Sequence, residues 1–209
     1  MKYKICLLFL LFCFSLNVCG SSAEWLENDI KRTLNHIDIE LQKNHQQFKK
    51  SPQLLASFVD SNLIKLWKGD KTLLGMLGKK RWHSLGAWER KQLVQEFNNT
   101  LQRYVQMGIH KYDGQKVEFN GLKVNQSGSR ALLTLKVIPN LLPSFDIQMK
   151  LNVKETGWQI YDVMIEGISY VSMKRNEFKN IYEKQGINGI VSELKLKNEG
   201  YLPSSIVPE

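Results

Sequence analysis

The chain has 209 residues, with 29 Lys and Arg against 20 Asp and Glu, and a formal net charge of +9. This length predicts a single domain with at most a small appendage, large enough to bury a core or to enclose a cavity. The excess of positive charge favours a negatively charged partner, such as a nucleic acid, an anionic membrane surface or an acidic protein, or else serves general solubility.

The N-terminus has the pattern of an export signal. Lys2 and Lys4 precede an uncharged apolar run at 5–18, and small residues follow, which predicts a signal peptide over 1–23 with cleavage after Ala23. Cleavage after Gly20 and acylation of Cys19, as in a lipoprotein, are the alternatives. All three cysteines lie in this leader, so cleavage after Ala23 leaves none. This excludes disulfides, thiol nucleophiles and cysteine-bound zinc from the mature protein.

The first half of the mature chain is predicted to be helical. Apolar residues recur at helical spacing over 24–50, and Pro52 starts a second helix, because proline is favoured in a first turn. A short helix is expected at about 71–80, ending near Gly78. The longest helix is expected at about 85–109, with Ser84 as its N-cap and Trp88 on its buried side.

After about residue 113 the hydrophobic period changes from 3.6 to 2, which indicates strands. Strands are predicted at 116–124, 130–138, 145–153 and 158–165, joined in sequence as an antiparallel meander. Helical patterns return in the 170s, and a last helix follows a break at Gly186. We expect one domain over 24–199, with 200–209 as an extended strap or a disordered tail. The order of elements predicts an α+β fold.

No motif for catalysis or metal binding stands out. The four histidines, His36, His45, His83 and His110, form no metal-ligand spacing, and neither a nucleophile elbow nor a phosphate-binding loop occurs. Basic residues gather beside an aromatic residue only at 79–82, so the interleaved pattern of a single-strand nucleic-acid binder is missing. The sequence therefore predicts no metal, no nucleic-acid partner and no enzyme activity.

The segment "WQIYDVMIEGISYVSMKRNEF", followed by "GINGIVSELK", resembles the MlaC family, also called the toluene-tolerance or ABC-transporter auxiliary family. The family pattern W-x-x-Y-D-x-x-x-E-G-x-S corresponds to Trp158, Tyr161, Asp162, Glu166, Gly167 and Ser169, with Arg175, Phe178 and 186–190 after it. Upstream, "LGKKRWHSLGAWERKQLVQEF" is similar to the family's stretch. Ser84, Gly86 and Asn188 depart from the usual residues, at positions that concern helix starts.

The resemblance implies a soluble phospholipid carrier in the periplasm of a Gram-negative bacterium. Its fold would be a curved antiparallel sheet, like that of nuclear-transport-factor domains, packed with a helical subdomain around an apolar cavity. The cargo would be a phospholipid, with no cofactor. The partners would be an outer-membrane lipoprotein–porin complex and an inner-membrane ABC transporter with a substrate-binding ring protein. Lipid shuttling between them would maintain outer-membrane lipid asymmetry.

Apolar and adaptable side chains are expected to line the cavity. The candidates come from the long helix, the sheet and the last helices: Phe97, Leu101, Tyr104, Val105, Leu135, Val137, Ile147, Met149, Val163, Ile165, Ile168 and Phe178. Each of them is equally compatible with an ordinary core position, because a packed core and a cavity wall need the same alternation.

A structural corner is expected where the last strand becomes a helix, at Glu166, Gly167, Ser169 and Arg175. Gly167 would allow the turn, Glu166 and Ser169 would satisfy free N–H groups of the helix, and Arg175 would pair with Glu166 or Asp162. The alternative function is a cavity-containing enzyme, of the isomerase or dehydratase type, acting on an apolar substrate. That enzyme needs a buried acid, for which Asp162 is the inviting candidate.

Overall fold

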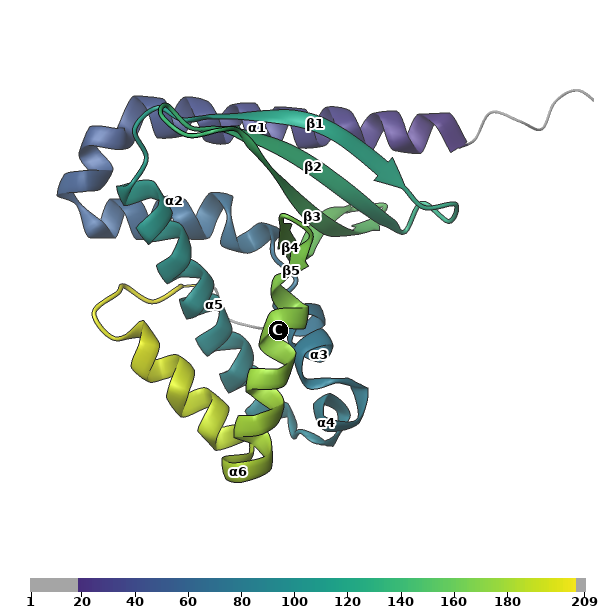
Figure 1. The fold of residues 1–209 in the computed structure, drawn as a ribbon, viewed down its shortest axis with the longest axis vertical. Helices are drawn as coiled ribbons and strands as arrows, with labels where there is room; N and C mark the ends of the chain where they lie inside the picture. The colour runs from purple at the N-terminus through teal and green to yellow at the C-terminus, as the bar shows by residue number, and fades with distance from the viewer. Residues whose placement is uncertain (1–18, 206–209) are drawn as a thin grey trace, which may run out of the picture.

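A long N-terminal helix lies along an antiparallel sheet, and the remaining helices form a second body that extends away from it (Figure 1). The structure is a computed structural model, and it describes residues 19–205. Residues 1–18 of the predicted signal peptide therefore lie outside the described part of the chain. In the described part of the chain, no helix is both long and apolar enough to cross a bilayer.

The sheet has five antiparallel strands in the order β1-β2-β3-β4-β5. The strands are β1 (Lys116–Val124), β2 (Arg130–Ile138), β3 (Phe145–Lys154), β4 (Gly157–Ile165) and β5 (Ile168–Ser169). Four of them match the predicted meander, and β5 adds a two-residue pairing with the end of β4. The predicted α+β class is confirmed.

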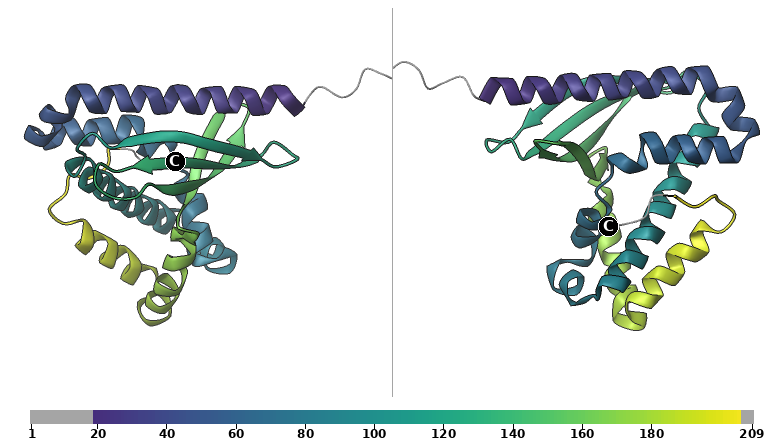
Figure 2. Two further views of the ribbon diagram at one scale, coloured as in Figure 1. Left: turned by 45° about the horizontal axis from the view of Figure 1, so that its top comes forward. Right: turned by 180° about the vertical axis from the view of Figure 1, so that it is seen from behind.

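The helices are α1 (Cys19–Lys50), α2 (Pro52–Asn62), α3 (Gly69–Leu77), α4 (Lys79–Ser84), α5 (Ala87–His110) and α6 (Tyr170–Asn198), with a 3₁₀ turn, η1 (Ile64–Leu66). α1 follows the sheet in every view (Figure 2). α2 starts as predicted, because Ser51 Oγ accepts a hydrogen bond from Leu54 N at 3.3 Å and Pro52 fills the first turn. α6 bends at Gly186, whose φ of 64° breaks the helix as expected.

The predicted bounds of the longest helix, about 85–109, agree closely with α5, but the predicted N-cap at Ser84 is wrong. Ser84 ends α4, where its hydroxyl donates to the Arg81 carbonyl at 2.8 Å, so it does not cap α5. The N-cap is Gly86, whose N–H donates to Glu89 Oε2 at 2.6 Å. Trp88 follows in the exposed first turn and is 66% exposed, contrary to the buried position expected for it.

The buried apolar residues form two clusters rather than one core. The helical cluster joins the second half of α1 to α2, α3, α4, α5 and α6, and includes Phe48, Leu73, Phe97 and Ile190. The sheet cluster joins the first half of α1 to one face of the sheet, and includes Ile30, Leu133, Leu151 and Trp158.

Two short segments connect the clusters. Along α1, Leu34 packs on the sheet cluster and Ile37 on the helical cluster. After α2, Leu63 packs on the helical cluster, Leu66 on the sheet cluster, and Trp67 on both. We call these five partly buried residues the apolar junction.

The C-terminal segment, 200–205, returns across α5 to α2 as a strap. Gln106 Nε2 donates to the Leu202 carbonyl at 3.2 Å, and Gln95 Nε2 to the Ser204 carbonyl at 3.1 Å. The buried carboxylate of Asp60 accepts from Ser204 Oγ at 2.7 Å and from Ser205 N and Oγ, both at 2.6 Å. These hydrogen bonds hold the segment 202–205 against α5 and α2.

The substitution Asp60→Asn tests this attachment. It removes the charge that strengthens the hydrogen bonds from the strap, and we expect the free energy of unfolding to fall by about 2 kcal/mol. Urea denaturation measures the change. Asp113→Asn, at an exposed position, is the matched control and should shift the unfolding free energy by less than about 0.5 kcal/mol. Equal effects of the two substitutions would contradict the attachment.

Candidate functional site

A β-bulge in β4 decides which face of the sheet each nearby side chain occupies. Lys150 of β3 pairs with Asp162, but Leu151 pairs with Ile160, so Tyr161 is one extra residue. Trp158 and Ile160 lie on the apolar face before the bulge, and Val163 returns to that face after it, opposite Met149. Asp162 is thereby placed on the other face, next to the helices.

The bulge also anchors the helices to the sheet. The Tyr161 carbonyl accepts a hydrogen bond from Thr72 Oγ1 of α3 at 2.8 Å, and the same hydroxyl accepts from Trp67 Nε1 at 2.9 Å. The N–H of Lys68 donates to the Ile160 carbonyl at 2.6 Å. The edge of β4 is thus satisfied by the loop that leads into α3, which fixes Trp67 between the two clusters.

Asp162 is buried and its carboxylate is fully engaged. Oδ2 accepts from Lys150 Nζ at 2.8 Å and from Ser169 Oγ at 2.7 Å, and Oδ1 accepts from Val171 N at 3.1 Å. Ser169 is the N-cap of α6 and accepts from Ser172 N at 3.1 Å. Asp162 therefore fastens the first turn of α6 to the sheet, on the face away from the apolar side chains.

The corner differs in detail from the expectation. Glu166 and Gly167 form the two-residue turn between β4 and β5, with φ of 50° and 80°. This is the turn type that twists hairpin strands correctly, and it needs positive φ at both positions. The Glu166 side chain is exposed, and Asp162 supplies the helix-capping carboxylate in its place. Arg175 Nε donates to the Gly75 carbonyl at 3.1 Å and joins α6 to α3, rather than pairing with Glu166 or Asp162.

The predicted lining residues are divided between the two clusters. Phe97, Leu101 and Phe178 are buried in the helical cluster, and Val105 packs against it. Leu135 is buried in the sheet cluster, with Met149 and Val163 packed against it. Val137 and Ile147 are half-buried, whereas Tyr104, Ile165 and Ile168 are 43%, 48% and 66% exposed. Their shared role as a cavity wall stays a prediction.

At the end of the sheet where β1 begins and β4 ends, apolar side chains form a continuous row across the strands. Val117 pairs with Val137, Val137 with Phe145, and Ile147 with Ile165, so their side chains share one face. Ile168 pairs with Ile165 at the end of β4. In the helical body, Tyr104 of α5 meets Tyr170 of α6 edge-on, with 6.3 Å between ring centroids. Burial raises the pKa of Tyr170, and the neighbouring Tyr104 raises it further, so this hydroxyl stays neutral.

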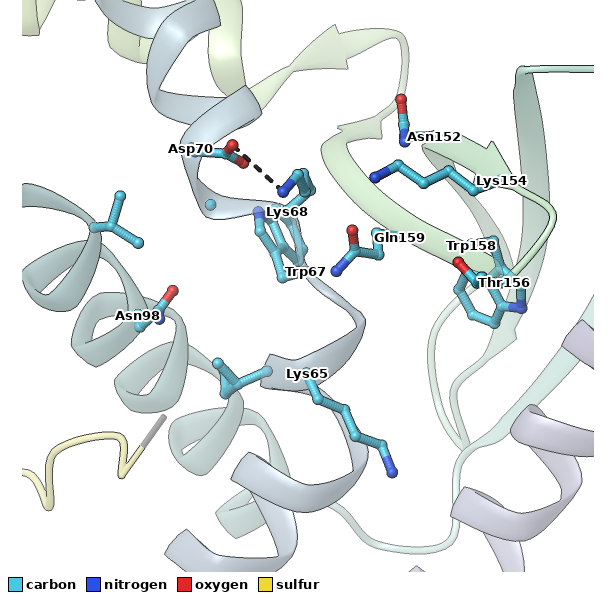
Figure 3. Close-up of a pocket in the computed structure, with 14 residues that line it drawn as sticks. Lys65, Trp67, Lys68, Asp70, Asn98, Asn152, Lys154, Thr156, Trp158 and Gln159 are labelled. Carbon is cyan, nitrogen blue, oxygen red and sulfur yellow. Dashed lines mark ion pairs between the residues drawn. The ribbon is translucent and has the colours of Figure 1, made fainter. Parts of the chain in front are cut away.

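Four pockets are described, and none is lined by any of the twelve predicted lining residues. The largest, of about 660 Å³, lies between η1, the start of α3, α5 and the β3–β4 turn (Figure 3). Glu166 and Gly167 line a second pocket, and Asp162, Ser169 and Arg175 line a fourth, of about 260 Å³. Within residues 19–205, no group of three or more His, Cys, Asp or Glu could hold a metal ion.

Comparison with known proteins decides the family. The sequence pattern of the MlaC protein family matches residues 31–196. The chain belongs to the MlaC family. It is 19% identical over 163 residues, covering 75% of this chain and 74% of the other, to the intermembrane phospholipid transport system binding protein MlaC of Haemophilus influenzae.

The fold of this MlaC-family protein matches a solved structure. That structure is the phospholipid-binding protein of Ralstonia solanacearum, solved in complex with a phospholipid. The TM-score is 0.72 at 17% identity, and the match covers 83% of this chain and 96% of the other. The five-stranded sheet with its helices is therefore the fold of that phospholipid-binding protein. The family resemblance inferred from the motifs around Asp162 and Gly167 is confirmed.

Sequence reasoning missed several residues that shape this region. Thr72, Trp67 and Lys150 hold the bulge and its carboxylate in place, and Asn98 lines the largest pocket. One signal was available for Asp162. Strict alternation along β4 would place Asp162 on the apolar face with Trp158 and Ile160, and Val163 on the opposite face. A bulge in β4 removes Asp162 from the apolar face and returns Val163 to it.

The substitution Asp162→Asn tests the fastening of α6. It leaves Lys150 without its carboxylate and weakens the cap, so the free energy of unfolding should fall by about 3 kcal/mol. Denaturant unfolding followed by circular dichroism measures it. Glu166→Gln, in the exposed turn, is the control and should change the value by less than about 0.5 kcal/mol. A larger loss of unfolding free energy in Glu166→Gln than in Asp162→Asn would show that Glu166, and not Asp162, fastens the helix.

The hairpin turn gives a second prediction, with opposite signs at adjacent positions. Gly167→Ala places a β-carbon at a φ of 80° and should lower the free energy of unfolding by about 1 kcal/mol. Glu166→Gly relieves a φ of 50° and should leave the value unchanged or raise it by up to about 1 kcal/mol. The same denaturation experiment compares them. A loss at Glu166→Gly as large as at Gly167→Ala would show that the Glu166 side chain supports the fold.

Proposed function

We propose that this protein is a periplasmic phospholipid carrier that moves lipid between an outer-membrane lipoprotein–porin complex and an inner-membrane ABC transporter with its substrate-binding ring protein. In this role it maintains the lipid asymmetry of the outer membrane. The observation that carries the proposal is the match of the MlaC family over 31–196. The domain spans about 24–199, after removal of a signal peptide that ends near Ala23. The phospholipid is cargo, and no covalent step is involved.

The division of the apolar residues into two clusters supports this function. A carrier must hold hydrocarbon chains and release them, so part of its apolar surface must be free to exchange one occupant for another. The helical and sheet clusters are joined by the five partly buried side chains of the apolar junction. We place the acyl chains between the clusters, in contact with Val105 on α5 and with Met149 and Val163 on the sheet.

The energetics of such a site suit transfer without chemistry. Two acyl chains carry about 28 methylenes, and each is worth about 0.8 kcal/mol when it leaves water, or roughly 20 kcal/mol in all. The same chains are equally dry in a membrane or in a partner's pocket, so exchange between apolar sites is nearly isoenergetic. Direction then depends on partners and not on the carrier.

Asp162 argues against the rival enzyme. An isomerase or dehydratase needs an acid or base that reaches the substrate within hydrogen-bond distance. Both carboxylate oxygens of Asp162 accept hydrogen bonds from protein groups, and its side chain lies on the face opposite Val163 and Met149. Asp162, the acidic residue of β4, therefore stabilises the fold.

Lipid that co-purifies with the protein tests the proposal. We expect organic extracts of natively purified protein to contain phospholipid in stoichiometric amount by mass spectrometry. Val105→Trp adds bulk at the proposed acyl-chain site and should lower the bound lipid several-fold. The melting temperature should stay within a few degrees, because Val105 is only partly buried. Leu196→Trp, at an exposed position of α6, should keep its lipid. Lipid-free wild-type protein, or equal lipid in both variants, would overturn the proposal.

A further inference from the structure

The largest described pocket is separate from the predicted lining residues but shares one wall with the apolar junction. Its volume is about 660 Å³, within the range of small-molecule sites. Trp67 lines it and also packs against both apolar clusters. A ligand with its apolar part at the junction can therefore extend a polar group past Trp67 into this pocket.

The charges around the pocket are predominantly positive. Lys65, Lys68 and Lys154 line it, together with a single acid, Asp70, whose Oδ2 lies 3.4 Å from Lys68 Nζ. Figure 3 shows Lys68 on the α3 side and Lys154 on the sheet side of the same opening. The three ammonium groups exceed the one carboxylate, so an anion entering the pocket is attracted.

The lowered pKa of the neighbouring Lys71 also reflects the concentration of positive charge around the pocket. Burial lowers its pKa, and the positive charges of Arg130, Lys68 and Lys154 lower it further, against the opposing effect of Asp70. Its ammonium group already donates to Asn152 Oδ1 and lies 4.4 Å from the centroid of the Tyr161 ring. Lys71 is thus engaged elsewhere and leaves Lys68 and Lys154 to face an incoming anion.

An amide side chain in the pocket wall has no partner in the described part of the chain. The Asn98 residue on α5 is 6% exposed, and its side chain makes no hydrogen bond to residues 19–205. Figure 3 shows Asn98 on α5 and Lys68 at the start of α3 among the residues that line the pocket. The amide group of Asn98 is therefore available to donate a hydrogen bond to a ligand oxygen.

We propose that this pocket binds the phosphate group of an anionic phosphate ester, with Lys68 and Lys154 as the charged donors and Asn98 as the amide donor. The inference rests on the proposed function where the ester is a phospholipid, whose phosphate then lies beside Trp67 while its acyl chains lie between the clusters. A water-soluble phosphate ester presents the same group to the same donors. The carrier would then select its cargo by the presence of a phosphate and not by hydrocarbon alone.

Competition between two lipids with the same acyl chains tests the lipid source. Protein is incubated at low salt with vesicles of dioleoylphosphatidylcholine that contain equal amounts of dioleoylphosphatidate and dioleoylglycerol, and the captured lipids are quantified by mass spectrometry after the vesicles are removed. We expect phosphatidate to exceed dioleoylglycerol by about tenfold, the equivalent of one charge-assisted hydrogen bond. Added salt should reduce the ratio, because the donors are partly exposed.

Matched variants assign the selection to the pocket. Lys68→Gln combined with Lys154→Gln should bring the ratio close to one. Lys179→Gln combined with Lys195→Gln removes the same charge from exposed positions of α6 and should retain the ratio. Thermal unfolding of the wild type and the two double variants verifies that each is folded. A second arm titrates sn-glycerol 3-phosphate into the protein and follows the NMR signals of the Asn98 amide and the Trp67 indole.

The outcomes separate the inference from the function on which it rests. Equal capture of both lipids by the wild type, with no response to glycerol 3-phosphate, overturns the phosphate site and leaves the carrier function intact. Capture of no lipid at all, phosphatidylcholine included, overturns the carrier function. In that case, signals that shift with glycerol 3-phosphate in the wild type but not in the Lys68→Gln, Lys154→Gln protein establish the pocket as a site for a soluble ester, and unshifted signals overturn it.

Discussion

One extra residue in β4 organises the whole molecule. The bulge at Tyr161 turns Asp162 toward the helices and frees the Tyr161 carbonyl for Thr72, while Val163 continues the apolar face beyond it. The sheet and the helical body are therefore joined at one edge by hydrogen bonds that cannot form in a regular strand. A shift of this single register would carry Asp162 into the apolar face, where an ionised carboxylate without partners is strongly unfavourable.

The apolar face of the sheet packs on α1, whereas the bulge joins the sheet to the other helices. α1 packs on the sheet through its first half and on the helices through its second half, so it spans two clusters that do not merge. Trp67 is held at the boundary by its hydrogen bond to Thr72. A rigid edge beside a divided interior is a suitable architecture for a carrier, since the cargo can exchange while the anchoring hydrogen bonds persist.

The periodic parts of the sequence predicted the fold well, and the short polar details predicted the site poorly. The meander over 116–165, the start of α2 at Ser51 and the bend at Gly186 follow from local chemistry that each segment carries alone. The N-cap prediction at Ser84 is wrong because a serine hydroxyl bonds as readily to a carbonyl one turn back as to the N–H groups of a new helix. The capping role expected of Glu166 belongs to Asp162, which is distant from α6 in the strand pattern and close to it only after the bulge.

By itself, the sequence determined the α+β class, the order of elements and the family, because hydrophobic period, capping residues and turn glycines act over a few neighbours. Tertiary structure alone decided the faces of Asp162 and Lys150, the division of the apolar residues into two clusters, and the meeting of Asn98 with Lys68 and Lys154. These depend on contacts between segments that are far apart in the chain. No local pattern encodes them, since the same alternation serves a solid core, a divided interior and a pocket wall.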